Sequence, residues 1–140
     1  MNTVDHIGIA VSSLEEALFL YTEQLGMKHI KTEMVASQGV NIAFLDAGSV
    51  KLELLEATAP NSPIARFIEK KGPGIHHIAY KVENIEERIA ELKNKGMEMI
   101  QDSPIPGAGG NMIAFMHPKA TGGVLMELCG KGGAGSEGHV

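Results

Sequence analysis

The chain has 140 residues, of which 44% are hydrophobic, so it is long enough for one domain with a single buried core. Its formal net charge of -5 argues against nucleic-acid binding, which needs clustered Lys and Arg, and no apolar run approaches the ~20 residues of a membrane span. Cys129 is its one cysteine, which gives no disulfide within the chain, and we therefore expect a cytoplasmic protein.

The first half of the chain predicts a strand, a helix and three further strands. Residues 4–11 alternate between bulky and small side chains, as in a strand with one face on the core and the other on a cavity. Ser12 or Ser13 then caps a helix that ends at Gly26. The three strands follow at residues 27–34, 40–45 and 50–55.

A connector at residues 57–74 leads to a second half with the same order of elements. The connector contains a short helix, because Ser62 is a good N-cap and Pro63 a good first residue. The second half predicts a strand at 75–82, a helix at about 85–95, and strands near 97–101, 112–116 and 124–129. The glycine-rich residues 130–140 have no apolar period, and we expect a flexible tail.

The two halves are a duplication. The segment DHIGIAV, which starts at residue 5, returns 71 positions later as HHIAYKV. VKLEL at 50–54 returns as VLMEL at 124–128. We therefore predict one α+β domain over residues 1–129, made of two tandem βαβββ modules at about 3–56 and 75–129. Pairing of the modules would form a half-open, barrel-like cavity with the helices outside.

Each module carries a histidine near its first strand and a glutamate near its last. The histidines are His6 and His77, since the neighbouring His76 falls on the other face of its strand. The glutamates are Glu53 and Glu127. A pseudo-twofold pairing of the modules would bring these four side chains together. Two imidazoles and two carboxylates predict a metal site that lines the cavity.

The alternative for Glu53 taken alone is a solvated side chain on a half-exposed strand. The repeat favours a ligand, and a set of two nitrogen and two oxygen ligands suits one divalent ion of Co, Zn, Ni or Mn. The residues do not rank these metals. The remaining histidines, His29, His117 and His139, have no histidine at the equivalent position of the other module and are not expected to be ligands.

Residues 3–129 resemble the vicinal oxygen chelate superfamily, and within it the methylmalonyl-CoA epimerase family. The resemblance is carried by DHIGIAV, by the segment at 72–96 and above all by FMHPKATGGVLMEL at 115–128. Glyoxalase I, another member, typically has an Asp-Pro-Asp/Asn-Gly turn where this chain has HPKATGG. The family's metal positions carry over to His6, His77 and Glu127, and to Glu53, where epimerases can carry Gln.

The resemblance implies an isomerase that interconverts the (R) and (S) forms of methylmalonyl-CoA by removing the alpha proton through a metal-stabilised enolate. Glu127 and Glu53 would be the catalytic bases, because residues 39–44 lack the further carboxylate that some members carry there. It also implies an acyl-CoA partner and a homodimer. Two alternatives stay open. One is a glyoxalase I-like lactoylglutathione lyase, since Glu53 restores the ligand set of bacterial glyoxalase I. The other is a non-catalytic, drug-sequestering protein of the same fold, which needs no metal ligands.

Overall fold

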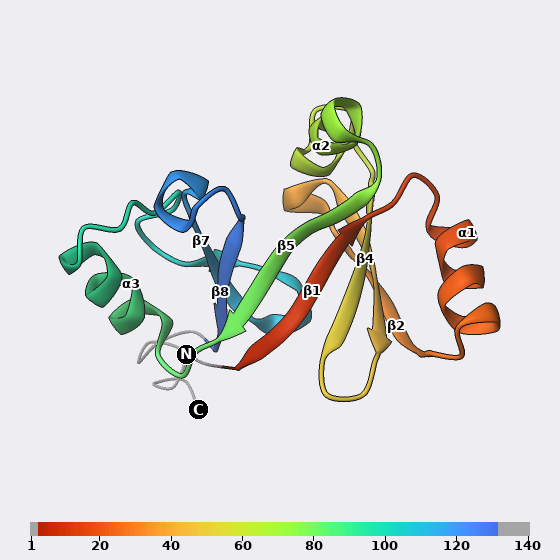
Figure 1. Cartoon of the computed structure of the whole chain (residues 1–140), viewed down its shortest axis with the longest axis horizontal. Helices are drawn as coiled ribbons and strands as arrows, with labels where there is room; N and C mark the ends of the chain where they lie inside the picture. Colours follow the sequence, from red (N-terminus) through yellow and green to blue (C-terminus); the bar gives the residue numbers. More distant parts are fainter. Residues whose placement is uncertain (1–2, 132–140) are drawn as a thin grey trace. The chain divides into compact units, whose positions relative to one another are not determined.

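The computed structural model describes residues 3–131, which divide into two compact units (Figure 1). The first unit is His6–His76. The second consists of the described residues of Met1–Asp5 and His77–Val140. Each unit holds one half of the sequence repeat, so the duplication seen in the sequence is also a duplication of structure.

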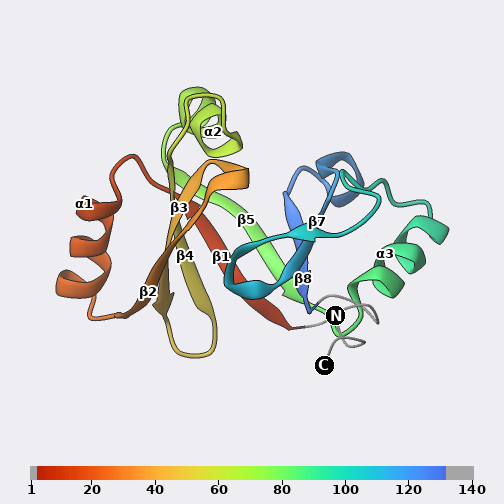
Figure 2. The ribbon, with the colours of Figure 1, turned by 180° about the vertical axis from the view of Figure 1, so that it is seen from behind.

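In the first unit, four strands form a mixed sheet with one helix at its start. The strand order is β2 (Lys28–Val35), β3 (Val40–Asp46), β4 (Lys51–Ala57) and β1 (Val4–Ala10), of which β1 and β4 are parallel and the other neighbours antiparallel. Figure 2 shows β3 and the strands beside it from behind. Helix α1 (Leu14–Leu18) begins at Ser13, whose Oγ accepts a hydrogen bond from the Glu16 amide at 3.2 Å, as the sequence predicts for an N-cap.

The core of the first unit lies between its sheet and α1. Apolar side chains from one face of the strands pack there against the helix: Ile7, Ile9, Ala43, Leu45, Leu52 and Leu54. Leu14, Ala17, Leu18 and Tyr21 are their helical partners. Helix α1 continues as a π-helical segment, Phe19–Gln24, and Leu25 beyond it is exposed. Because successive residues of a strand point to opposite faces, the alternate residues of β1 and β4 lie on the face away from the helix.

The second unit repeats this arrangement. Its strands are β5 (Gly74–Lys81), β6 (Ile105–Pro106), β7 (Met112–Met116) and β8 (Met126–Gly130), in the spatial order β5, β8, β7, β6, and β5 and β8 are parallel. Helix α3 (Ile85–Asn94) begins at Asn84, whose side chain accepts from the Glu87 amide at 3.0 Å. Ile85, Ile89 and Leu92 pack on Ala114, Met116 and Leu128 of the sheet.

Helix α2 (Pro63–Lys71) occupies the connector, where the sequence predicts it. Ser62 caps it by accepting from the Ala65 amide at 3.2 Å, and Pro63 is its first residue. The α+β class and the tandem βαβββ order are confirmed. Among the described residues, no helix is both long and apolar enough to cross a membrane.

The predicted strand at 97–101 is wrong. Only an isolated bridge joins Met99 to Met116, and the second strand of this module is the short β6 further along the chain. The Oε1 atom of Gln101 accepts the hydrogen bond of the Phe115 amide at 2.7 Å. The Gln101 side chain thus takes the place that a backbone carbonyl has in a strand ladder, and the pairing of residues 97–101 with β7 does not continue. At the other end, Gly130 belongs to β8 rather than to the predicted tail, and residues 132–140 lie outside the described residues.

Candidate metal centre

The first unit holds a buried pair of a histidine and a glutamate on neighbouring parallel strands. In the register of β1 and β4, Gly8 lies opposite Glu53, so His6 stands two residues earlier on the same face of the sheet. The Nδ1 atom of His6 lies 3.3 Å from Oε2 of Glu53. The two residues are only 3% and 7% exposed. The predicted ligands of this half are therefore in contact.

The second unit holds the equivalent pair. Ala79 lies opposite Glu127 in the register of β5 and β8, and His77 stands two residues earlier. The Nε2 atom of His77 lies 2.9 Å from Oε1 of Glu127. These residues are 6% and 4% exposed. The second pair thus has the same strand register and is similarly buried, but it meets through Nε2 of its histidine, whereas the first pair meets through Nδ1.

The antiparallel neighbours of the two glutamates match as well. Phe44 of β3 lies opposite Glu53, and Phe115 of β7 lies opposite Glu127. The ring of Phe115 meets the His77 ring edge to face, with centroids 5.6 Å apart and an angle of 87° between the planes. The two phenylalanines are related by the sequence repeat, but only the strand pairing reveals that each lies beside a glutamate. Each buried glutamate therefore has a small residue on one side and an aromatic ring on the other.

Burial excludes the alternative of a solvated Glu53. A carboxylate taken out of water is costly unless it is paired or binds a metal. The distances also fit a metal, because neighbouring ligands of an ion bound at about 2.0–2.2 Å lie roughly 3 Å apart. The 3.3 Å and 2.9 Å separations are of this size. Each unit thus offers a nitrogen and an oxygen ligand suited to one divalent ion, and a joint site of all four residues stays a prediction.

The other described histidines have different surroundings. His76 packs edge to face on Phe67 of α2, with ring centroids 4.9 Å apart. His29 is exposed and its Nε2 lies 2.9 Å from Thr32 Oγ1. His117 accepts a hydrogen bond from the Lys119 amide at the start of a short 3-10 turn. His139 lies outside the described residues.

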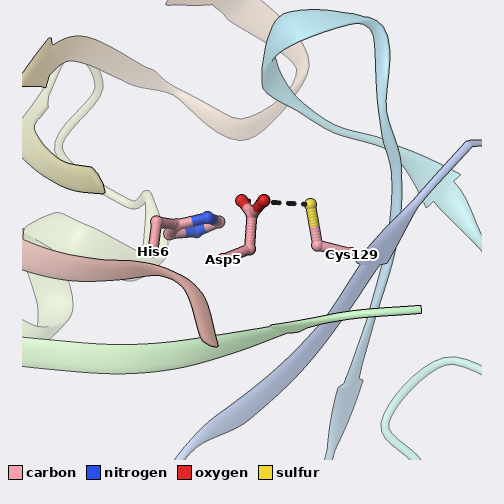
Figure 3. A group of neighbouring side chains, drawn as sticks. All are labelled: Asp5, His6 and Cys129. Carbon is pink, nitrogen blue, oxygen red and sulfur yellow. Dashed lines mark hydrogen bonds between the residues drawn. The ribbon is translucent and has the colours of Figure 1, made fainter. Parts of the chain in front are cut away.

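Cys129 is a buried strand residue with a specific partner. Its thiol lies two positions after Glu127 and donates to the Asp5 carboxylate at 3.8 Å, as drawn in Figure 3. Asp5 immediately precedes the predicted ligand His6 in β1. The contact joins residues 124 positions apart in the chain, so the sequence offers no local signal for it.

The family model that matches residues 5–115 is that of the Glyoxalase/Bleomycin resistance protein/Dioxygenase superfamily. The chain belongs to this superfamily, which agrees with the resemblance found in its repeated modules.

Individual proteins are similar to the chain over most of its length. The chain is 46% identical to the uncharacterized protein YqjC of Bacillus subtilis, with 92% of each chain covered. It is 38% identical to the ethylmalonyl-CoA/methylmalonyl-CoA epimerase of Cereibacter sphaeroides, covering 89% of this chain and 95% of that protein. A variant of the methylmalonyl-CoA epimerase of Streptomyces coelicolor, solved with 2-nitronate-propionyl-CoA, matches with a TM-score of 0.86 and 36% identity over 91% of this chain and 93% of that one. The fold and the predicted family are confirmed.

Proposed function

We propose that this protein is a methylmalonyl-CoA epimerase, an isomerase that interconverts the (R) and (S) forms by removing the alpha proton and returning it on the other face. The observation that carries this is the pair of buried, register-equivalent contacts, His6 with Glu53 and His77 with Glu127. Relatives named as epimerases of methylmalonyl-CoA support the substrate. An acyl-CoA substrate agrees with the proposed chemistry and with the names of these relatives.

We further propose that His6, Glu53, His77 and Glu127 together hold one divalent ion of Co, Zn, Ni or Mn. The support is the donor set, the burial of all four residues and the spacing within each pair. A bound ion supplies a Lewis acid that stabilises the negative charge left when the alpha proton departs. Phe115 helps to orient His77, because its ring packs against the imidazole.

The two glutamates are the proposed bases. A carboxylate has two oxygens, so each residue can keep one oxygen as a ligand and use the other to accept or return a proton. Epimerisation requires proton transfer on both faces of a planar intermediate, and two equivalent glutamates on different strands suit such a task. Burial removes competing water from each carboxylate.

A glyoxalase I-like lactoylglutathione lyase is the second candidate. The observation that favours it is Glu53, because a carboxylate at this position completes two like pairs of ligands. A drug-sequestering protein is disfavoured, since it has no use for two buried pairs of metal ligands. The epimerase and the lyase use the same chemistry of proton removal, so only their substrates distinguish them.

Exchange of the alpha proton into heavy water tests the proposal. The purified protein with added Co²⁺ is supplied with methylmalonyl-CoA, or with the hemithioacetal of methylglyoxal and glutathione, and hydrogen loss is followed by NMR. We expect deuterium in methylmalonyl-CoA together with interconversion of its epimers. Product from the hemithioacetal alone would establish the lyase, and no reaction of either substrate would favour the binding protein.

The remaining proposals concern assembly and compartment. We propose a homodimer in the cytoplasm, with a small-molecule acyl-CoA as partner and no nucleic acid. Sedimentation equilibrium measures the mass of the assembly in solution. A mass near 14.9 kDa, that of one chain, would contradict the homodimer.

A further inference from the structure

Strand β2 carries a charged pair on the face of the sheet that holds Glu53. In the strand registers, Lys31 lies opposite Phe44, and Phe44 lies opposite Glu53, so the three form one row across the sheet. Glu33 lies in the next row, opposite Ile42. The helix-covered face carries the intervening residues of β3 and β4, such as Ala43 and Leu52. Lys31 and Glu33 therefore share the face of the proposed ligands.

The ammonium group of Lys31 is held above the residue that borders Glu53. Its Nζ atom lies 5.2 Å from the centroid of the Phe44 ring and 3.5 Å from Oε1 of Glu33. The Phe44 side chain is buried, whereas the side chain of Lys31 is 54% exposed. The cation is thus positioned by an aromatic ring and a carboxylate and is still accessible to a further anion.

The second unit differs at the equivalent place. The face around Glu127 is lined by a cluster of apolar side chains, namely Ala79, Ile105, Ile113, Phe115 and Cys129. The two units therefore have like ligands but unlike surroundings.

We propose that Lys31 binds an anionic oxygen of the substrate, a carboxylate or a phosphate, on the face of the sheet that holds Glu53. This inference rests on the proposed function, which supplies a substrate that carries both groups. The net charge of -5 repels a polyanion, and a cation two strands from Glu53, on the same face of the sheet, offsets that repulsion locally. Lys31 is then a substrate-binding residue in addition to the predicted site.

Equilibrium binding measured by titration calorimetry tests this role. Racemic methylmalonyl-CoA, which an epimerase cannot change further, is titrated into the wild-type chain and into Lys31→Gln, Lys31→Arg and Lys71→Gln. Lys71 is the matched control, because its Nζ lies 5.8 Å from the ring of Phe67 on α2. We expect about a three- to tenfold weaker Kd for Lys31→Gln, as a partly exposed ion pair allows. Lys31→Arg and Lys71→Gln should bind like the wild type.

Two further ligands identify the anion. Propionyl-CoA lacks the acyl carboxylate, and methylmalonyl-pantetheine lacks the nucleotide phosphates of CoA. If Lys31→Gln weakens both methylmalonyl thioesters and spares propionyl-CoA, Lys31 binds the carboxylate. If it weakens both CoA thioesters and spares the pantetheine, Lys31 binds a phosphate. Equal weakening of all three, or of none, would overturn the proposal.

The result also separates this proposal from the function on which it rests. Wild-type protein that binds none of the three ligands would overturn the proposed function and the role of Lys31 together. Wild-type binding that Lys31→Gln leaves unchanged would overturn the role of Lys31 alone. The melting temperature of each variant is measured as a control. A variant that melts at the same temperature as the wild type has changed in binding and not in folding.

Discussion

Glu53 and Glu127 occupy equivalent positions in the two units. Each lies opposite a small residue of the parallel neighbour, Gly8 or Ala79, and opposite a phenylalanine of the antiparallel neighbour. Each also contacts the histidine that precedes the small residue by two positions. A structural duplication thus produces two similar pairs of proposed metal ligands, and their separate contributions can be measured one residue at a time.

Replacing His6 or His77 by Ala is expected to remove most of the bound divalent ion. Each substitution deletes one of four proposed ligands and leaves its glutamate partner buried beside an empty space. Metal content after dialysis, measured by elemental analysis, checks this. His29→Ala is the control, because His29 is exposed and bonds to Thr32. Unchanged metal content in both ligand variants would exclude the proposed centre.

Glu127→Gln is expected to abolish turnover while the fold survives. The amide has nearly the same shape and can still accept a hydrogen bond from His77, but it cannot accept the alpha proton, so we expect a loss of about a hundredfold or more. Glu53→Gln should affect metal content less than the loss of a histidine, since an amide oxygen still ligates. Steady-state rates and melting temperatures measure these effects. A Glu127→Gln enzyme with near wild-type turnover would remove Glu127 from the chemistry.

Glu53→Gln also separates a one-base from a two-base mechanism. If each glutamate serves one face of the substrate, Glu127 should still exchange the alpha hydrogen of one epimer with heavy water, while the epimers no longer interconvert. NMR detects the exchange, and a chiral assay of the product detects the interconversion. Epimerisation at nearly the wild-type rate would mean that Glu53 is a ligand only and that another group returns the proton.

Leu54→Ala and Leu128→Ala are expected to destabilise the protein to similar extents. The two leucines follow the ligand glutamates, are fully buried and belong to the helix-side cores of the two units. Removal of such a side chain costs about 2–5 kcal/mol of the free energy of unfolding. Leu25→Ala is the control, since Leu25 is 57% exposed and should change stability little. Denaturant titration gives the values, and a small effect at either core position would argue against the packing described.

Much of the site could be predicted because it follows from local and repeated patterns. The equivalence of His6 with His77, and of Glu53 with Glu127, is visible as identical residues at matching places in two like modules. The helix starts are equally local, because an N-cap such as Ser13 bonds to an amide only three residues away. Alternation, helix caps and the repeat therefore determined the class of fold, most of the order of elements and the identity of the candidate ligands.

Other features depend on strand pairing, which the sequence does not encode locally. The register shift between His29 and Lys31 decides which residues of β2 share the face of Glu53, and no pattern in β2 reveals that shift. The predicted strand at 97–101 failed because the Gln101 side chain, rather than a backbone carbonyl, bonds to Phe115. The contact of Cys129 with Asp5 joins the two ends of the described chain. The sequence alone determined which residues can bind a metal. The tertiary structure decided how each pair meets, that both pairs are buried, and which charges lie beside them, because these depend on contacts between residues far apart in the chain.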